Sequence, residues 1–409
     1  MSTESFNLMD PALAQDPFRE YGKLREKTPL TPLAYPGVDT TIWMATRHED
    51  VQAILNDPRL VRDRRSVPGM EGPSIADQMI QSYGIAEKYR DYFDGMVIMD
   101  GANHSRLRTL VTPSFTVRRV NERRGRIEQI LDEILEKVAG QDEFDLIKEV
   151  AFPLAGNVVC DLIGVDEEDW PLFHRWVADF NAGDPSLLVT CIPEMIEYTK
   201  GLVERRRSEP GDDMISRMIQ TSDEDGGRLS DTEMVTMVLL LVQAGHNPAA
   251  HFVANAVVAF FDNPDQLELL RSRPDLVPNA VREMLRIGGS VSLVAPMYAT
   301  EDIEVAGNVV RQGEAVMPAL VAANGDPRKF PEPERIDLTR EMGPGEGHVA
   351  FGHGPHYCLG AALARMTGEI VFERLLIKEP GLALAVPRDT LERQLLPGVF
   401  HLKSLPVRL

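Results

Sequence analysis

The arrangement of apolar and polar positions divides the chain into many helices and a few short strands. Apolar residues at helical spacing predict helices over 17–27, 48–56, 127–138, 155–163, 169–180 and 193–204. β-Branched and aromatic residues predict a strand over 41–45. The polar stretch 62–97, with proline and glycine at 68–69 and 72–73, is expected to form a loop with short helices. The pattern predicts a mainly α protein with small β-sheets.

The longest apolar segment begins at Ser230 and ends at Phe261, and it is apolar almost all round, which is typical of a buried helix. Ser230-Asp231-Thr232-Glu233 has the spacing of a capping box and predicts the start of this helix. Pro248 lies inside the segment, and proline removes a backbone donor and clashes with the preceding turn. We therefore expect a kink over 244–248, where a ligand passes over the helix.

A second segment, FGHGPHYCLG at 351–360, gathers glycines and a proline around one cysteine, directly before a helical run over 361–376. Glycine lets a flat ligand approach the backbone closely. A cysteine at the start of a helix lies near amide donors and the positive end of the helix dipole, which favour the thiolate, the form that binds metals. A lone Cys-Leu-Gly would equally be a buried cysteine beside an ordinary turn, so the interpretation depends on the whole segment.

The ten residues have the pattern F-G-x-G-x-H-x-C-x-G and closely resemble the haem-binding loop of the cytochrome P450 family. The resemblance implies that Cys358 is the axial thiolate ligand of haem b iron and that His356 approaches a haem propionate. The resemblance also implies haem contacts for Phe351, Gly352 and Gly360, which are further fixed positions of the pattern. A thiolate ligand pushes electron density onto iron and favours cleavage of the O–O bond. The implied fold is a triangular helical prism around a buried haem, formed by one domain over residues 1–409.

Other segments match the family in order along the chain. His104 and Arg108 form an H-x-x-x-R pair on one helical face, which implies two contacts to haem propionates. Taken alone, this pair could equally belong to a solvated basic helix. His348 is a further candidate for a propionate contact, and Ala244 for a haem contact on the long helix.

The long helix resembles the family's oxygen-activating helix, whose pattern is A-G-x-(Glu or Asp)-Thr. Asn247 stands at the position of the acid and Pro248 at that of the threonine, so the usual proton-delivering groups are absent. Substrate or ordered water could relay protons instead, with His246 or Asn247 orienting the water. Alternatively, the chemistry requires only hydrogen or electron abstraction, as in radical coupling. We take Gly245, His246 and Asn247 as the catalytic candidates, while His246 could also be a partly buried helix residue.

Downstream, Glu283 and Arg286 form an E-x-x-R pair, and by resemblance Arg335 completes a structural Glu-Arg-Arg cluster. The following segment is expected to line the substrate pocket through Ser290, Ser292, Leu293 and Val294. Met297 stands where the family usually has a propionate-binding arginine. We therefore expect fewer cations at the propionates.

Composition and charge limit the classes of binding partner and the expected location of the protein. The formal net charge of −20 argues against nucleic acid and anionic membranes. Three cysteines form no disulfide framework, and no basic and apolar leader or membrane-length apolar run is present, so we expect a cytoplasmic protein. The segment 104–126 contains only one acid, Glu122, and seven arginines: Arg106, Arg108, Arg118, Arg119, Arg123, Arg124 and Arg126. These arginines could attract an acidic electron donor, or they could form a solvated face.

The resulting hypothesis is a monomeric P450 oxidoreductase of secondary metabolism. It would use dioxygen and electrons from ferredoxin and ferredoxin reductase on a small hydrophobic or aromatic natural product. Substrate-assisted hydroxylation and radical coupling, for example of indole-bearing cyclic dipeptides, both fit the altered helix. A peroxide-driven peroxygenase and a non-catalytic haem-binding sensor are the alternatives.

Overall fold

The computed structural model describes residues 6–8, 10–34, 41–72, 75–224, 229–343, 345–394 and 398–409. The chain forms two compact units, one of Met1–Pro68, Leu131–Ala151 and Pro248–Leu409 and the other of Gly69–Ile130 and Phe152–Asn247. The N-terminal residues 1–5 and Pro73, which entered the sequence predictions, lie outside the described residues. The single domain expected over 1–409 stays a prediction.

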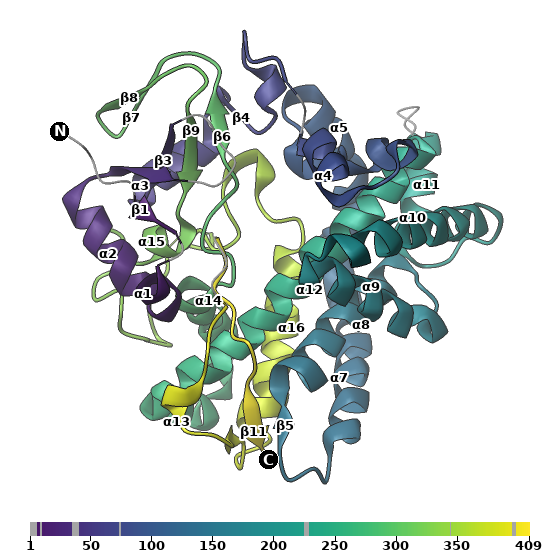
Figure 1. Cartoon of the computed structure of the whole chain (residues 1–409). Helices are drawn as coiled ribbons and strands as arrows, with labels where there is room; N and C mark the ends of the chain where they lie inside the picture. The colour runs from purple at the N-terminus through teal and green to yellow at the C-terminus, as the bar shows by residue number, and fades with distance from the viewer. Residues whose placement is uncertain are drawn as a thin grey trace. The chain divides into compact units, whose positions relative to one another are not determined.

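The first unit contains every strand of the described residues. Its main sheet has the order β1-β2-β3-β9-β6-β4, formed by Phe6–Asn7, Leu30–Ala34, Ile42–Ala45, Ala315–Pro318, Met297–Ala299 and Leu60–Val61 (Figure 1). The predicted strand is β3, which runs parallel to β9 with Ile42 opposite Ala315. Two smaller sheets are β7-β8 (Ile303–Val305, Asn308–Val310) and β10-β11-β5 (Ala383–Leu384, Pro406–Arg408, Phe144–Asp145).

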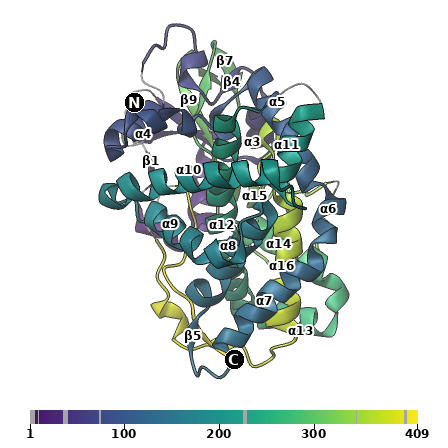
Figure 2. The ribbon, with the colours of Figure 1, turned by 90° about the vertical axis from the view of Figure 1, so that its right-hand side faces the viewer.

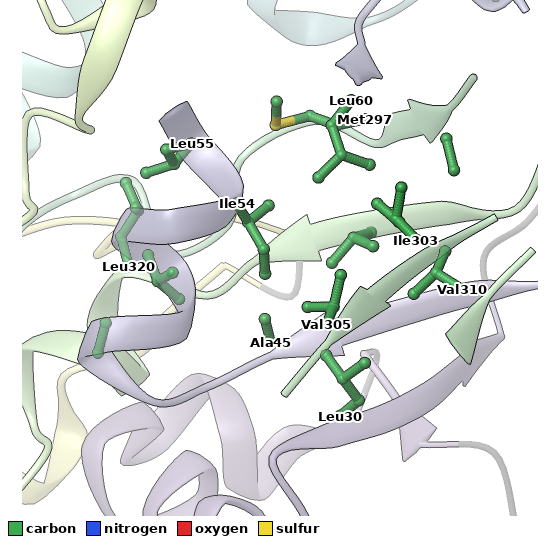
Figure 3. Packing of buried hydrophobic residues seen from close by; sticks show 14 of the residues in the cluster. Leu30, Ala45, Ile54, Leu55, Leu60, Met297, Ile303, Val305, Val310 and Leu320 are labelled. Atoms are coloured by element: carbon green, nitrogen blue, oxygen red, sulfur yellow. The ribbon is translucent and has the colours of Figure 1, made fainter. Parts of the chain in front are cut away.

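An apolar core joins the main sheet to α3 (His48–Asn56) within this unit (Figure 3). Its members come from strands and helices far apart in sequence, among them Leu30, Ile54, Met297 and Leu320. The other helices of the unit are α1 (Pro11–Gln15), α2 (Pro17–Lys27), α13 (Pro264–Ser272), α14 (Val277–Gly288), α15 (Leu320–Asn324) and α16 (Ala361–Val371). The predicted bounds of α2 and α3 are confirmed.

The second unit is helical in all of its described elements. It contains α4 (Ile75–Tyr83), α5 (Gly101–Val111), α6 (Val117–Glu122), α8 (Phe152–Ile163), α9 (Trp170–Ala182), α10 (Pro185–Ser208) and α11 (Met214–Glu224). Two helices, α7 (Arg124–Val138) and α12 (Asp231–Asp262), contribute residues to both units. Figure 2 shows α8, α9 and α10. The predicted mainly α protein with small sheets is confirmed.

The start predicted for α10 at residue 193 is wrong. The helix begins at Pro185 and encloses Pro193. The physical reason is the sequence before it, because Asp184 caps the helix by accepting a hydrogen bond from the Ser186 N–H at 2.8 Å and Pro185 suits the first helical position. Gly183, with φ of 64°, ends α9 directly before this cap.

The capping box predicted for α12 is confirmed. The Ser230 N–H donates to the Glu233 carboxylate at 2.9 Å, and the Glu233 N–H donates to the Ser230 hydroxyl at 3.1 Å. The helix is continuous through Pro248 over 32 residues. None of the helices in the described ranges combines the length and apolar character needed to cross a membrane.

Candidate active site

The cysteine loop is a tight turn in the first unit. The Cys358 N–H donates to the Phe351 carbonyl at 2.8 Å, and the Cys358 side chain is exposed. Gly354 has φ of 70°, and a Cβ there would lie 2.6 Å from the Leu55 carbonyl oxygen on α3, so only glycine fits. Gly352 also has positive φ, at 72°. The loop thus presents one accessible thiol on a fixed turn, a donor that suits haem iron.

Tyr357 and His356, the two residues before Cys358, are half-buried. Burial, and then the charge of Cys358, raises the pKa of Tyr357 to about 12. His356 is half-buried in the short 3-10 turn Gly354–His356. α16 begins at Ala361, one residue after Gly360, as the sequence predicted. These residues fit a haem-thiolate site, in which His356, Phe351, Gly352 and Gly360 would surround the cofactor and Cys358 would bind its iron.

His348 lies three residues before Phe351, and its contact with a propionate stays a prediction. Its side chain is buried, and burial together with Arg282 and Arg286 lowers its pKa to about 3. Its Nδ1 accepts a hydrogen bond from the Ala350 N–H at 3.3 Å. At neutral pH this side chain is uncharged and helps to fix the backbone before the cysteine loop.

His104 and Arg108 lie in α5 of the second unit, with His104 buried and Arg108 half-buried. Their four-residue spacing in a regular helix places them on one face, as predicted. Contact of both residues with the cofactor held by the cysteine loop stays a prediction.

The turn of α12 before Pro248 packs closely on α8 in the second unit. A Cβ on Gly245 would lie 2.7 Å from Cγ2 of Val159, so glycine permits the two helices to approach. Gly156 on α8 is equally constrained, since its Cβ would lie 2.6 Å from Nε2 of His174. Gly245 therefore permits close helix packing, and its catalytic role stays a prediction.

His246 is directed at α8. Its Nε2–H donates to the Phe152 carbonyl at 2.9 Å, and its ring stacks on His174 with centroids 6.1 Å apart. Burial, partly offset by the Phe152 carbonyl, lowers its pKa to about 4. At 100° per residue, His246 lies about 200° around the helix from the exposed Ala244. His246 is thus a buried helix residue, which goes further than the partly buried one expected, and its catalytic role stays a prediction.

Asn247, the third catalytic candidate, is hydrogen-bonded to another side-chain amide. Its Oδ1 accepts a hydrogen bond from Nδ2 of Asn181 on α9 at 2.9 Å. In the first unit, the Ser290 hydroxyl donates to the Pro248 carbonyl at 2.8 Å. Asn247 is thus hydrogen-bonded to a neutral amide, and the Pro248 carbonyl is hydrogen-bonded to a hydroxyl. No local sequence signal indicates Asn181, because its partner lies 66 residues away.

The predicted substrate segment is well fixed. Ser290, Ser292 and Leu293 are buried, and Val294 is half-buried. The Ser292 N–H donates to the Gly398 carbonyl at 2.8 Å, and the Val294 N–H donates to the Pro318 carbonyl at 3.0 Å. Their contact with substrate stays a prediction.

The predicted Glu-Arg-Arg cluster exists with a different third member. Glu283 and Arg286 are fully buried and pair at 2.8 Å. The third cation is Arg340, whose Nε donates to Glu283 Oε1 at 3.1 Å, while the exposed Arg335 side chain pairs with Glu332. Arg335 contributes its backbone carbonyl to Arg340 at 2.9 Å. The assignment of the Arg335 side chain is therefore wrong, because the chain turns at 332–335 and directs that side chain to solvent.

Met297 is an apolar core residue of β6, packed in the cluster that contains Leu60 and Ile303 (Figure 3).

The positive charge of the arginine-rich segment of the second unit is largely neutralised. Most of the seven arginines pair with acids, several of them distant in sequence: Glu122, Glu128, Asp161, Glu167 and Glu233. The expected excess of positive charge is therefore smaller than the sequence suggests.

Comparison with known proteins gives the family. The sequence model described as Cytochrome P450 matches residues 166–378. Cytochrome P450 107B1 of Saccharopolyspora erythraea is 38% identical over 98% of this chain and 96% of its own length. The 6-deoxyerythronolide B hydroxylase of the same organism is 37% identical over 96% of each chain. The structure of the Bacillus subtilis polyketide synthase P450 PksS superposes with a TM-score of 0.89 at 31% identity over 99% of both chains. The chain belongs to the cytochrome P450 family and is a haem-dependent oxidoreductase with that family's fold.

Proposed function

We propose that this P450 enzyme inserts one oxygen atom into a hydrophobic natural product of polyketide type, with substrate or ordered water relaying protons. The names of the relatives support the substrate class. They include the 6-deoxyerythronolide B hydroxylase, the monooxygenase PikC of Streptomyces venezuelae at 34% identity, and the polyketide biosynthesis P450 PksS. The first name specifies a hydroxylase, the second a monooxygenase and the third a protein of polyketide biosynthesis.

The observation that carries the relay proposal is the chemistry at Asn247 and Pro248. A carboxamide cannot act as an acid near neutral pH, and Asn247 Oδ1 already accepts the Asn181 amide. Pro248 has no hydroxyl, and the hydroxyl bonded to its carbonyl belongs to Ser290. Protons therefore need a carrier other than the side chains at these two positions, which is the part we assign to substrate or water.

Haem b is the cofactor that we assign to Cys358, and ferredoxin with its reductase is the proposed electron source. The haem supplies oxygen activation when bound, and the chain positions the thiolate through the Cys358 N–H bond to Phe351. We further propose that the enzyme is cytoplasmic and monomeric.

Radical coupling is the second candidate, because it needs no oxygen insertion and suits the altered turn. The P450 CxnD, whose structure is titled for C–S bond formation in chuangxinmycin biosynthesis, superposes with a TM-score of 0.85 at 29% identity. Bond formation therefore occurs in a protein similar to this chain.

Product mass after turnover under oxygen-18 gas separates the candidates. The holoenzyme, ferredoxin and reductase are supplied with a macrolactone that shifts the haem spin state. One labelled oxygen per product is expected. A product that has lost hydrogens or joined two molecules without label would establish coupling instead. Equal turnover with hydrogen peroxide and no reductase would establish a peroxygenase.

A further inference from the structure

A carboxylate lies beside the cysteine loop in the first unit, at Glu346. It directly precedes Gly347, which has φ of 74° and whose Cβ would lie 2.1 Å from the Met342 carbonyl oxygen, so the turn that holds Glu346 requires glycine. Arg282 on α14 donates to the backbone carbonyls of Gly345 and Glu346 at 2.7 and 3.1 Å. The position of Glu346 is therefore fixed by the backbone and by α14.

The Glu346 carboxylate joins both sides of the cysteine loop. Its Oε1 accepts a hydrogen bond from the Tyr357 hydroxyl at 3.1 Å, and the same oxygen pairs with Arg365 of α16. Tyr357 directly precedes Cys358, and α16 directly follows the loop. One carboxylate thus links the residue before the thiolate to the helix after it.

The cation of this pair also lies against the loop. The Arg365 guanidinium is 6.0 Å from the ring centroid of Phe351, whose carbonyl accepts the Cys358 N–H. The side chains of Arg365 and Glu346 are only 26% and 19% exposed, so water screens their charges incompletely. Opposite charges held beside the loop affect the electrostatic potential at the thiolate in opposite directions.

We propose that Glu346 and Arg365 are positioning residues that set the reduction potential of the thiolate-ligated haem. Reduction of the ferric iron adds one electron, so a nearby positive charge favours the reduced state and a negative charge disfavours it. Glu346 neutralises Arg365 and keeps the thiolate strongly electron-donating. The inference rests on Cys358 as the haem ligand and is independent of the substrate proposed above.

The test is the reduction potential of the purified, substrate-free holoprotein, measured by spectroelectrochemistry in four variants. Glu346→Gln should raise the equilibrium constant for reduction about tenfold, which is 59 mV for one electron. Arg365→Gln should lower it by a similar factor. The double variant should return to within about twofold of the wild type, because its net charge is restored. Glu341→Gln, an exposed acid of the same segment, is the matched control and should change little.

A purely structural role gives a different result. If loss of either side chain only loosened the loop, both single variants would shift the potential in the same direction and the double variant would be worse. Shifts no larger than that of Glu341→Gln would also overturn the proposal. The carbon-monoxide difference spectrum of each variant reports whether thiolate ligation is intact, so failure of the ligand assignment is distinguishable from failure of the charge proposal.

Discussion

The cysteine loop and the turn of α12 at Pro248 differ in how closely their residues match the patterns of the cytochrome P450 family. The loop has every fixed residue of the pattern, and its geometry depends on backbone features such as the glycine at 354. The turn of α12 lacks both the acid and the alcohol of its pattern. Its side chains instead contact α8 and α9, through His246 and Asn247.

This difference shows that cofactor binding and proton delivery place different demands on the sequence. A thiolate on a fixed turn is needed by any haem-thiolate chemistry, so substitutions there remove the function. Proton delivery can be supplied by several groups or by water, so the residues at 247 and 248 can change without loss of the fold. The following predictions test that contrast, from the largest expected effect to the smallest.

The largest effect is expected for Cys358→Ser, which removes the soft ligand. The reduced, carbon-monoxide-bound absorbance typical of haem-thiolate proteins should disappear and turnover should fall to background. Cys160→Ser is the matched control, because Cys160 is buried in α8 and its thiol should not affect the spectrum. Retention of the thiolate spectrum in Cys358→Ser would contradict the assignment.

Glu283→Gln should lower the free energy of unfolding by about 3–5 kcal/mol, because Arg286 would remain buried without its counter-charge. Arg340→Gln should have a smaller effect, and Arg335→Gln should stay within about 0.5 kcal/mol because its side chain is exposed. Chemical denaturation measures all three. An Arg335 effect that exceeds the Arg340 effect would restore the sequence-based assignment.

Gly245→Ala should destabilise the protein by about 1–3 kcal/mol, since the new Cβ would lie 2.7 Å from Val159. Adding Val159→Ala should relieve the clash, so the two substitutions should be strongly non-additive in thermal unfolding. Simple additivity would show that α8 and α12 do not approach as closely as described.

Acid should destabilise the fold through buried, neutral histidines. His401 stacks on His251 with ring centroids 3.7 Å apart, and burial, together with His251 and Arg393, lowers its pKa to about 3. Its contribution to stability is complete above the unfolded pKa of about 6.5 and is lost as the pH falls toward 3. Between pH 7 and 5 the loss should reach about 2 kcal/mol. Denaturation of His401→Gln should show a weaker pH dependence, and an unchanged slope would refute this.

Much of the fold and the cofactor site could be predicted from the sequence, because local signals determine them. Capping residues define the start of α12, and the glycines and cysteine of 351–360 define the loop. Contacts between distant segments were not predictable. Nothing local distinguishes Arg340 from Arg335 as the partner of Glu283, and the pairing of Arg123 with Asp161 depends on how the end of α6 packs against α8. For the same reason, the direction of His246 required the structure.

The most direct test of the central claim is the fraction of consumed electrons that appears in oxygenated product, compared between the wild type and Pro248→Thr. We predict that the wild type couples most of its electrons to labelled product under oxygen-18 gas and that the restored threonine brings no improvement, because substrate or water already relays the protons. A wild type that releases its electrons mainly as hydrogen peroxide, beside a Pro248→Thr variant that converts them into product, would contradict the account.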